Sequence, residues 1–201
     1  MGNTWIVDVE ASGKYPTSAN LLQVAALKFS DRLEDWKLYN WYINPRSPIP
    51  FEVKNLTGLD EEYLREQSDG LYFEEVCEDI QETILQPGDL LVGHNIKKYD
   101  SVVIKNNFSR AGIKLRDFPN MYDTMLEAKN LSFVHSGKWI KLGELFNMAC
   151  EHYNVNSKLF MDTLLKSFDF NEHELQAHNA KYDVLVNGLL YRLMRINLGD
   201  S

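Results

Sequence analysis

The chain has 201 residues, enough to bury a core as one domain and fewer than two domains usually need. Its composition, with 44% hydrophobic and 25% charged residues, excludes a disordered or collagen-like chain. No apolar run approaches the roughly 20 residues that cross a bilayer, and the first residues lack the pattern of a secretory signal. We therefore expect one domain over residues 1–201, located in the cytoplasm and with no membrane partner, in which Cys77 and Cys150 are free thiols.

The formal net charge of −8 is concentrated in one segment. Residues 60–82 contain ten acidic side chains and one arginine, a net charge of −9, so the rest of the chain carries +1. We interpret this run as a solvated acidic helix face. The distribution excludes the broad positive surface of a tight nonspecific nucleic-acid binder, but it allows moderate binding at a local site.

The first part of the chain predicts strands before helices. β-Branched and aromatic residues favour strands over residues 4–9, 21–29 and 38–43, and prolines predict a loop over residues 45–50. A short helix is expected over residues 55–64, entered through Thr57-Gly58. Apolar residues at helical spacing then predict an amphipathic helix over residues 73–85.

The second part alternates short strands with helices. We expect strands over residues 89–92 and near residues 121–122, and a helix that opens with a capping box at Thr124 and Glu127. Further helices are predicted over residues 99–111, 141–153 and 180–197. This order of elements predicts an α/β fold, with a mixed sheet flanked by helices.

Asp8 and Glu10 stand two residues apart near the end of the first predicted strand. Side chains at this spacing share one face of a sheet, where two carboxylates repel each other unless a cation is bound. An isolated pair of this kind is more often a solvated strand end. Asp100 follows a strand and a turn, where α/β sheets gather ligands, although an aspartate in a first helical turn also suits the helix dipole.

His178 and Asp183 form a third element of the acidic set. Five residues correspond to about 140° on a helix, so the two side chains converge only if His178 lies in the turn before the helix. A histidine beside metal-binding carboxylates suits a general base, and a helix-capping or surface histidine is the alternative. Carboxylates without a thiolate cluster predict two Mg²⁺ or Mn²⁺ ions rather than zinc.

The ordered motifs DVEASG, GHNIKKYD and HNAKYD resemble those of the DEDDh exonucleases, a ribonuclease-H-like family that includes polymerase proofreading subunits and ribonuclease T. The resemblance covers roughly residues 4–195. It implies a five-stranded mixed sheet, two metal ions and release of nucleoside 5′-monophosphates from the 3′ ends of single-stranded DNA or RNA. The family's metal ligands map onto Asp8, Glu10, Asp100 and Asp183, and its catalytic histidine maps onto His178.

The sequence departs from the family around the first motif, where Ala11 and Ser12 stand in place of the usual threonine. Ser12 is still a candidate for binding the terminal sugar, and His94 and Asn95 are candidate turn-shaping or substrate-lining residues. In residues 132–141, Lys138 and Trp139 predict a loop that stacks a base and holds a phosphate. Packing of Trp139 into the core is an equal alternative.

Three functions fit this pattern: an active 3′→5′ exonuclease, a nucleic-acid-binding protein of the same fold without turnover, and an internally cutting nuclease of the ribonuclease H type. The presence of all five motif residues favours the first, and the histidine before the last aspartate argues against the third. The sequence leaves open a homodimer, association with a polymerase, and the choice between DNA and RNA.

Overall fold

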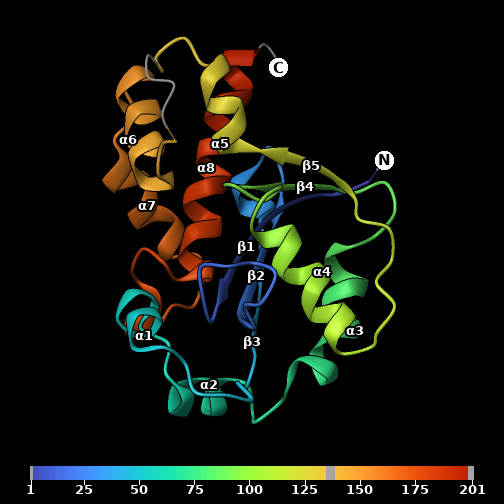
Figure 1. Ribbon diagram of the computed structural model, residues 1–201. Coiled ribbons are helices and arrows are strands. Elements are labelled where there is room, and N and C mark those ends of the chain that lie inside the picture. The colour runs from blue at the N-terminus through green and yellow to red at the C-terminus, as the bar shows by residue number, and fades with distance from the viewer. Residues whose placement is uncertain (1, 135–138, 199–201) are drawn as a thin grey trace.

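The computed structural model describes residues 2–134 and 139–198. Its centre is a five-stranded sheet in the order β3-β2-β1-β4-β5 (Figure 1). Strands β1 to β3 are antiparallel neighbours, whereas β4 and β5 run parallel to β1. The strands are Thr4–Ala11 (β1), Leu21–Phe29 (β2), Lys37–Tyr42 (β3), Leu90–Gly93 (β4) and Asn120–Asp123 (β5).

Helices cover both faces of this sheet (Figure 1). One face packs against α3 (Phe73–Ile84) and α4 (Asp100–Arg110). The other packs against α8 (Ala180–Leu198), with α5 (Thr124–Glu127), α6 (Leu142–His152) and α7 (Ser157–Leu165) around it. Two short helices, α1 (Phe51–Thr57) and α2 (Glu61–Gln67), follow β3 and pack with the ends of β2 and β3. The predicted mixed sheet flanked by helices is confirmed.

Residue alternation along β1 separates the two cores. Trp5, Val7 and Val9 are buried on the side of α3 and α4, whereas Ile6 is buried on the side of α8. Because strand side chains alternate, Asp8 and Glu10 continue the Ile6 face. The first strand therefore presents its two carboxylates toward the helix that carries Asp183.

Two local predictions were wrong, and one helix was missed. The segment after β3 is two helices and not one, because Gly58 ends α1 in a left-handed conformation (φ 73°) and Asp60 caps α2. The cap of α5 is Asp123, whose side chain accepts the N–H groups of Met125 and Leu126, so the expected box at Thr124 is absent. Helix α7 was not predicted.

Other expectations agree with the structure. The apolar face of α3 is buried, and its acidic residues point outward; nine of the ten acids in residues 60–82 are exposed, with Glu61 partly buried. Cys77 and Cys150 are buried free thiols. Among the described residues, no helix combines the length and apolarity needed to cross a bilayer.

Helix α8 approaches the sheet closely at Gly188. A Cβ atom there would lie 2.9 Å from Leu27 Cδ2 and 3.1 Å from the Trp36 ring. Both neighbours are buried, so they have little room to move. The absence of a side chain at this position lets α8 lie flat against β1 and β2, which brings its first turn to the strand carboxylates.

Gly188→Val should therefore destabilise the fold by about 2–3 kcal/mol through overpacking. Gly143→Val is the matched control: Gly143 is also helical, but a Cβ there would meet nothing within 4 Å. Urea unfolding should show a change below about 0.5 kcal/mol for the control. Equal stability of the two variants would contradict the close approach at Gly188.

Candidate active site

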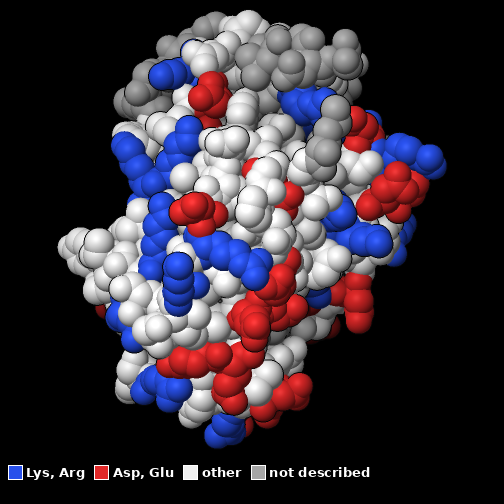
Figure 2. Space-filling view, turned by 90° about the vertical axis from the view of Figure 1, so that its right-hand side faces the viewer, with Lys and Arg blue, Asp and Glu red and all other residues white. Residues whose placement is uncertain are grey.

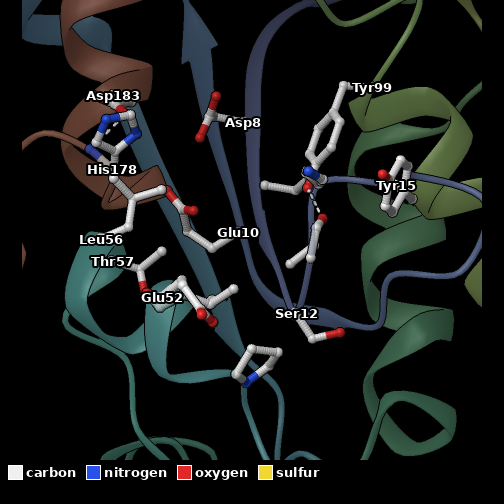
Figure 3. A pocket seen from close by; sticks show the side chains of 16 residues that line it. Asp8, Glu10, Ser12, Tyr15, Glu52, Leu56, Thr57, Tyr99, His178 and Asp183 are labelled. Atoms are coloured by element: carbon white, nitrogen blue, oxygen red, sulfur yellow. Dashed lines mark hydrogen bonds between the residues drawn. The ribbon is translucent and has the colours of Figure 1, made fainter.

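The candidate functional residues meet where β1 ends beside the first turns of α8 and α4 (Figure 3). Asp8 and Glu10 pair across the sheet with Ala25 and Gln23 of β2. A register shift between Glu10 and Ala11 ends the regular pairing directly after the second carboxylate. Because of this break, the chain leaves the sheet at residues 12–15 and forms one wall of the site.

Helix α8 supplies Asp183 from its first turn, and the preceding turn supplies His178. The backbone of His178 is left-handed (φ 65°), and its N–H donates to Asp183 Oδ2 at 3.0 Å. This arrangement confirms that His178 lies before the helix and not on it. The His178 side chain is exposed at the mouth of the site, close to the carboxylate that its backbone holds.

Three carboxylates converge closely enough to share a cation. One oxygen from each of Asp8, Glu10 and Asp183 can be chosen so that all three lie within 4.8 Å of one another. A donor set made only of carboxylate oxygens suits a hard divalent cation such as Mg²⁺ or Mn²⁺. The site therefore fits a divalent metal ion.

Asp100 reaches the site from the start of α4 but is held differently. Its side chain is only 3% exposed, and Oδ1 accepts the Val9 N–H at 3.2 Å. The carboxylate thus bonds to the backbone of β1 between the two strand carboxylates. It lies outside the tight three-residue group, yet it is near enough to raise the pKa of Asp8 electrostatically.

Burial raises the pKa values of all four carboxyl groups, and repulsion from the neighbouring carboxylates adds to the shift at Asp8 and Glu10. Burial is the largest cause in each case. It raises the pKa of Asp100 to about 7 and that of Asp183 to about 6. Asp8 and Glu10 also have pKa values well above normal, with the neighbouring acids as a second cause. Four poorly solvated acids at one place are costly unless a cation or protons neutralise them.

Two cavities open from this centre. The α1 cavity, about 830 Å³, runs from the carboxylates between residues 11–15 and helix α1 (Figure 3). The Trp139 hollow, about 590 Å³, runs in another direction between the turn at His94 and the first turn of α6. Asp8, Tyr99, His178 and Asp183 line both. The carboxylates thus stand at the junction of two compartments.

Known proteins resemble this chain in both sequence and structure. The ε subunits of DNA polymerase III from Rickettsia felis and Rickettsia prowazekii are 23% and 25% identical over 190 residues, which is 92% of this chain and 71% of each subunit. The 3′–5′ exonuclease DinG of Bacillus subtilis is 29% identical over 113 residues, 56% of this chain and 11% of DinG. No family model matches the chain.

Solved exonuclease I structures share the fold. One superposes with a TM-score of 0.72 at 15% identity, and E. coli exonuclease I in complex with a dA16 oligonucleotide superposes at 0.71 and 14%. Each comparison covers the whole of this chain but only 42% of the exonuclease I chain.

The similarity to the ε subunits and DinG in sequence, and to exonuclease I in fold, supports a DEDDh 3′→5′ exonuclease. Its five-stranded mixed sheet is the ribonuclease-H-like fold that the sequence motifs implied.

In this exonuclease, the other predicted site residues differ in their surroundings. Ser12 lines the α1 cavity, and its Oγ accepts the Asn20 N–H at 2.9 Å, which closes the loop after β1. His94 lines the Trp139 hollow, where its ring bridges Thr124 Oγ1 at 3.1 Å and the Ile140 carbonyl at 2.8 Å. Burial lowers the pKa of His94. Asn95, at φ 68°, lies in the turn and lines the same hollow.

Trp139 is on the surface, so of the two alternatives for this residue the one in which it packs into the core is wrong. Its side chain is 61% exposed, and Lys98 Nζ lies 4.2 Å from its ring centroid. Lys138 lies outside the described residues. An exposed indole beside an ammonium group has the composition of a stacking and phosphate-binding surface.

Three residues that shape the site were not identified as such from the sequence. Asp123, fully buried, accepts the N–H groups of Asn95 and Lys97 and so holds the turn before α4. Tyr99 donates to the Gly13 carbonyl at 2.7 Å and ties α4 to the loop after β1. Its pKa is raised to about 12 by burial and by the nearby carboxylates. Gln23 lies beneath the site, opposite Glu10.

The charged surface of the exonuclease is uneven. On the side that carries α3 and α4, acidic side chains gather over the lower part of the face, whereas Lys and Arg follow its left edge (Figure 2). No broad positive surface appears on this face. The prediction of a local rather than a general electrostatic attraction for nucleic acid is consistent with this view.

Asp100→Asn should stabilise the metal-free protein above neutral pH. The folded pKa of Asp100 is raised to about 7, so the folded state is penalised as pH rises through the range between the unfolded value near 4 and about 7. The asparagine oxygen can still accept the Val9 N–H. We expect a gain on the order of 2 kcal/mol at pH 8, shrinking toward pH 4, in thermal unfolding with chelator present. A pH-independent effect would contradict this origin.

Proposed function

We propose that this exonuclease hydrolyses the last phosphodiester bond at the 3′ end of single-stranded DNA or RNA and releases a nucleoside 5′-monophosphate. The observation that carries the proposal is the convergence of Asp8, Glu10 and Asp183 beside an exposed His178 at the junction of two cavities. This junction has the chemistry needed at a scissile phosphate with one nucleotide on each side.

The carboxylates of Asp8, Glu10, Asp100 and Asp183 would hold two divalent cations, Mg²⁺ or Mn²⁺. When bound, such ions supply a nucleophile at neutral pH and stabilise the charge on attacking and leaving oxygens. The role of the protein is to hold the carboxylate oxygens that would bind these ions in fixed positions. The break in strand pairing after Glu10 and the Asp100–Val9 bond hold three of them against the end of β1.

His178 would act as the general base. Its imidazole is exposed at the mouth of both cavities, where it can accept the proton of the attacking water and release it to solvent. The bond from its backbone N–H to Asp183 keeps the imidazole next to the carboxylates. As the water oxygen bonds to phosphorus, the bond to the 3′ oxygen of the preceding nucleotide breaks.

The two cavities would hold the nucleotides on either side of that bond. The α1 cavity combines apolar Val53 and Leu56 with the ring of Tyr15, which suits a sugar and a base. Ser12 lines it as a candidate contact to the terminal sugar. The Trp139 hollow, with Asn95 and the Trp139–Lys98 pair at its edge, would receive the preceding strand.

The first experiment is a gel assay with 5′-labelled single-stranded DNA and RNA of one sequence, in Mg²⁺, Mn²⁺ or chelator. Shortening by one nucleotide at a time, abolished by chelator, is the expected result, and the faster substrate identifies the preferred nucleic acid. Binding without shortening would favour the protein without turnover. Cutting of a circular strand would favour the internally cutting nuclease.

His178→Ala should lower kcat by roughly 10²–10⁴ and leave divalent-metal binding nearly intact. His173→Ala is the matched control, because His173 lies five residues earlier, packs on Tyr63 and lines neither cavity. Single-turnover rates and metal titration by calorimetry separate the two effects. Full activity in His178→Ala would remove the general-base role.

Trp139→Ala should raise KM for long single strands by about 10–100-fold, the range expected when one base loses its stacking partner. A dinucleotide offers only one nucleotide beyond the scissile bond and tests how far the contact reaches. If KM for a dinucleotide and for a 12-mer rises equally, Trp139 contacts the nucleotide next to the bond. If neither rises, Trp139 does not contact the substrate.

A further inference from the structure

Buried amide groups connect the beginning of α8 with the strand next to β1. The side chains of Gln23 on β2 and Asn179 are both 0% exposed. Gln23 Nε2 donates to Asn179 Oδ1 at 3.3 Å and to Asn40 Oδ1 on β3 at 2.9 Å. Gln23 Oε1 accepts the Ala180 N–H at 3.2 Å. Both ends of the glutamine amide are therefore engaged between two strands and a helix.

Asn179 caps α8 with both its side chain and its carbonyl group. Its Oδ1 accepts the Lys181 N–H at 3.1 Å, and its carbonyl accepts the N–H groups of Tyr182 and Asp183, each at 2.9 Å. Together with the Gln23–Ala180 bond, these contacts satisfy the first N–H groups of the helix. The helix begins at a point fixed by the sheet.

This fixed point lies directly between the two catalytic candidates. His178 is the residue before Asn179, and Asp183 is four residues after it. The left-handed backbone of His178 costs of order 1 kcal/mol for a non-glycine residue and persists only where the surroundings hold it. The Asn179–Gln23 contact and the bond from the His178 N–H to Asp183 are the restraints on either side of this turn.

The location of Gln23 shows which part of the sheet the turn before α8 is tied to. Gln23 is the cross-strand partner of Glu10, on the face of the sheet that meets α8. Amides buried here cost free energy unless fully bonded, and an apolar pair of similar size would pack without that cost. What the amides add is a directional link between the strand with Glu10 and the turn with His178.

We infer that Gln23 and Asn179 are positioning residues that hold His178 in register with the strand carboxylates. Neither is proposed to touch the substrate. The inference rests on the proposed function of His178 as the general base. Misplacement of a catalytic group by about 1 Å can cost on the order of 100-fold in rate, so a loss of this link should reduce kcat far more than KM.

Gln23→Met and Asn179→Ala test the link. Each should lower kcat by about 10–100-fold, leave KM within about threefold, and leave the protein folded at the assay temperature. In hydrogen–deuterium exchange, residues 177–182 should exchange faster in both variants, and β1 should be unchanged.

Asn179→Ser separates the helix cap from the link without adding a charge to the site. Asn179 Oδ1 accepts from both Gln23 Nε2 and the Lys181 N–H. Serine is a neutral helix cap that can still accept the Lys181 N–H, but its side chain is too short to reach Gln23. We expect Asn179→Ser to lower kcat and to speed exchange in residues 177–182 as Asn179→Ala does.

Val24→Ala is the control for general destabilisation. Val24 follows Gln23 in β2 and is also 0% exposed, but it faces the core on the other side of the sheet. This cavity-forming variant should lose stability of about 1–3 kcal/mol without a fall in kcat below its unfolding temperature.

Three results would overturn the inference: unchanged kcat in Gln23→Met, a fall in Val24→Ala equal to that in Asn179→Ala, or an Asn179→Ser variant with the wild-type kcat. The exchange measurement needs no activity. If the wild-type protein were inactive on every substrate, the proposed function would fail, and exchange in residues 177–182 would still decide whether the amide link holds the turn.

Discussion

Electrostatic repulsion among carboxylates is the constraint on which this structure depends. Asp8 and Glu10 share one face of a central strand, and Asp100 and Asp183 are directed to the same place by helices on opposite sides of the sheet. Burial is the largest cause of their raised pKa values, and at Asp8 and Glu10 repulsion from the neighbouring carboxylates raises the pKa further. Like charges separate unless the scaffold holds them. The rigid parts of the fold therefore lie around the site: the β1–β2 ladder, the close contact of α8 at Gly188 and the buried Asp123 beneath the turn before α4.

The strand order explains how segments distant in sequence meet. Strand β1 lies at the centre, with an antiparallel neighbour on one side and a parallel one on the other. The connection after β4 begins at the same edge of the sheet as the end of β1, which places the start of α4 beside Val9. Helix α8 crosses β1 and β2 on the other face, its first turn supplies Asp183, and the turn before it supplies His178. The acids thus come from three separate parts of the chain.

Much of this arrangement could be predicted from the sequence. β-Branched and aromatic composition predicted the strands, helical spacing predicted the α3 face and the beginning of α8, and the motifs identified the residues that meet. The helices of residues 51–67 were harder to predict. Gly58 ends the first of them with a positive φ, a conformation that a glycine permits but does not require. Trp139 shows a second limit: exposure of a tryptophan depends on what packs nearby. Gln23 shows a third, since one glutamine within an apolar strand carries no sign of its partners before the helix is in place.

On the proposed function, the carboxylate cluster would also control how nucleic acid approaches. A phosphodiester strand entering the junction of the α1 cavity and the Trp139 hollow would meet four acidic groups, and it would be repelled there unless cations or protons neutralise them. Attractive groups lie farther out: Lys98 on the Trp139 ring, and Lys14 over the Tyr15 ring. Aromatic stacking and these peripheral ammonium groups can attract a strand without a metal ion, but they cannot bring its phosphate to Asp8 and Asp183. On the proposed function, the charge of the site would therefore couple metal binding to correct placement of the strand, because a strand bound without cations would be held away from Asp8 and Asp183.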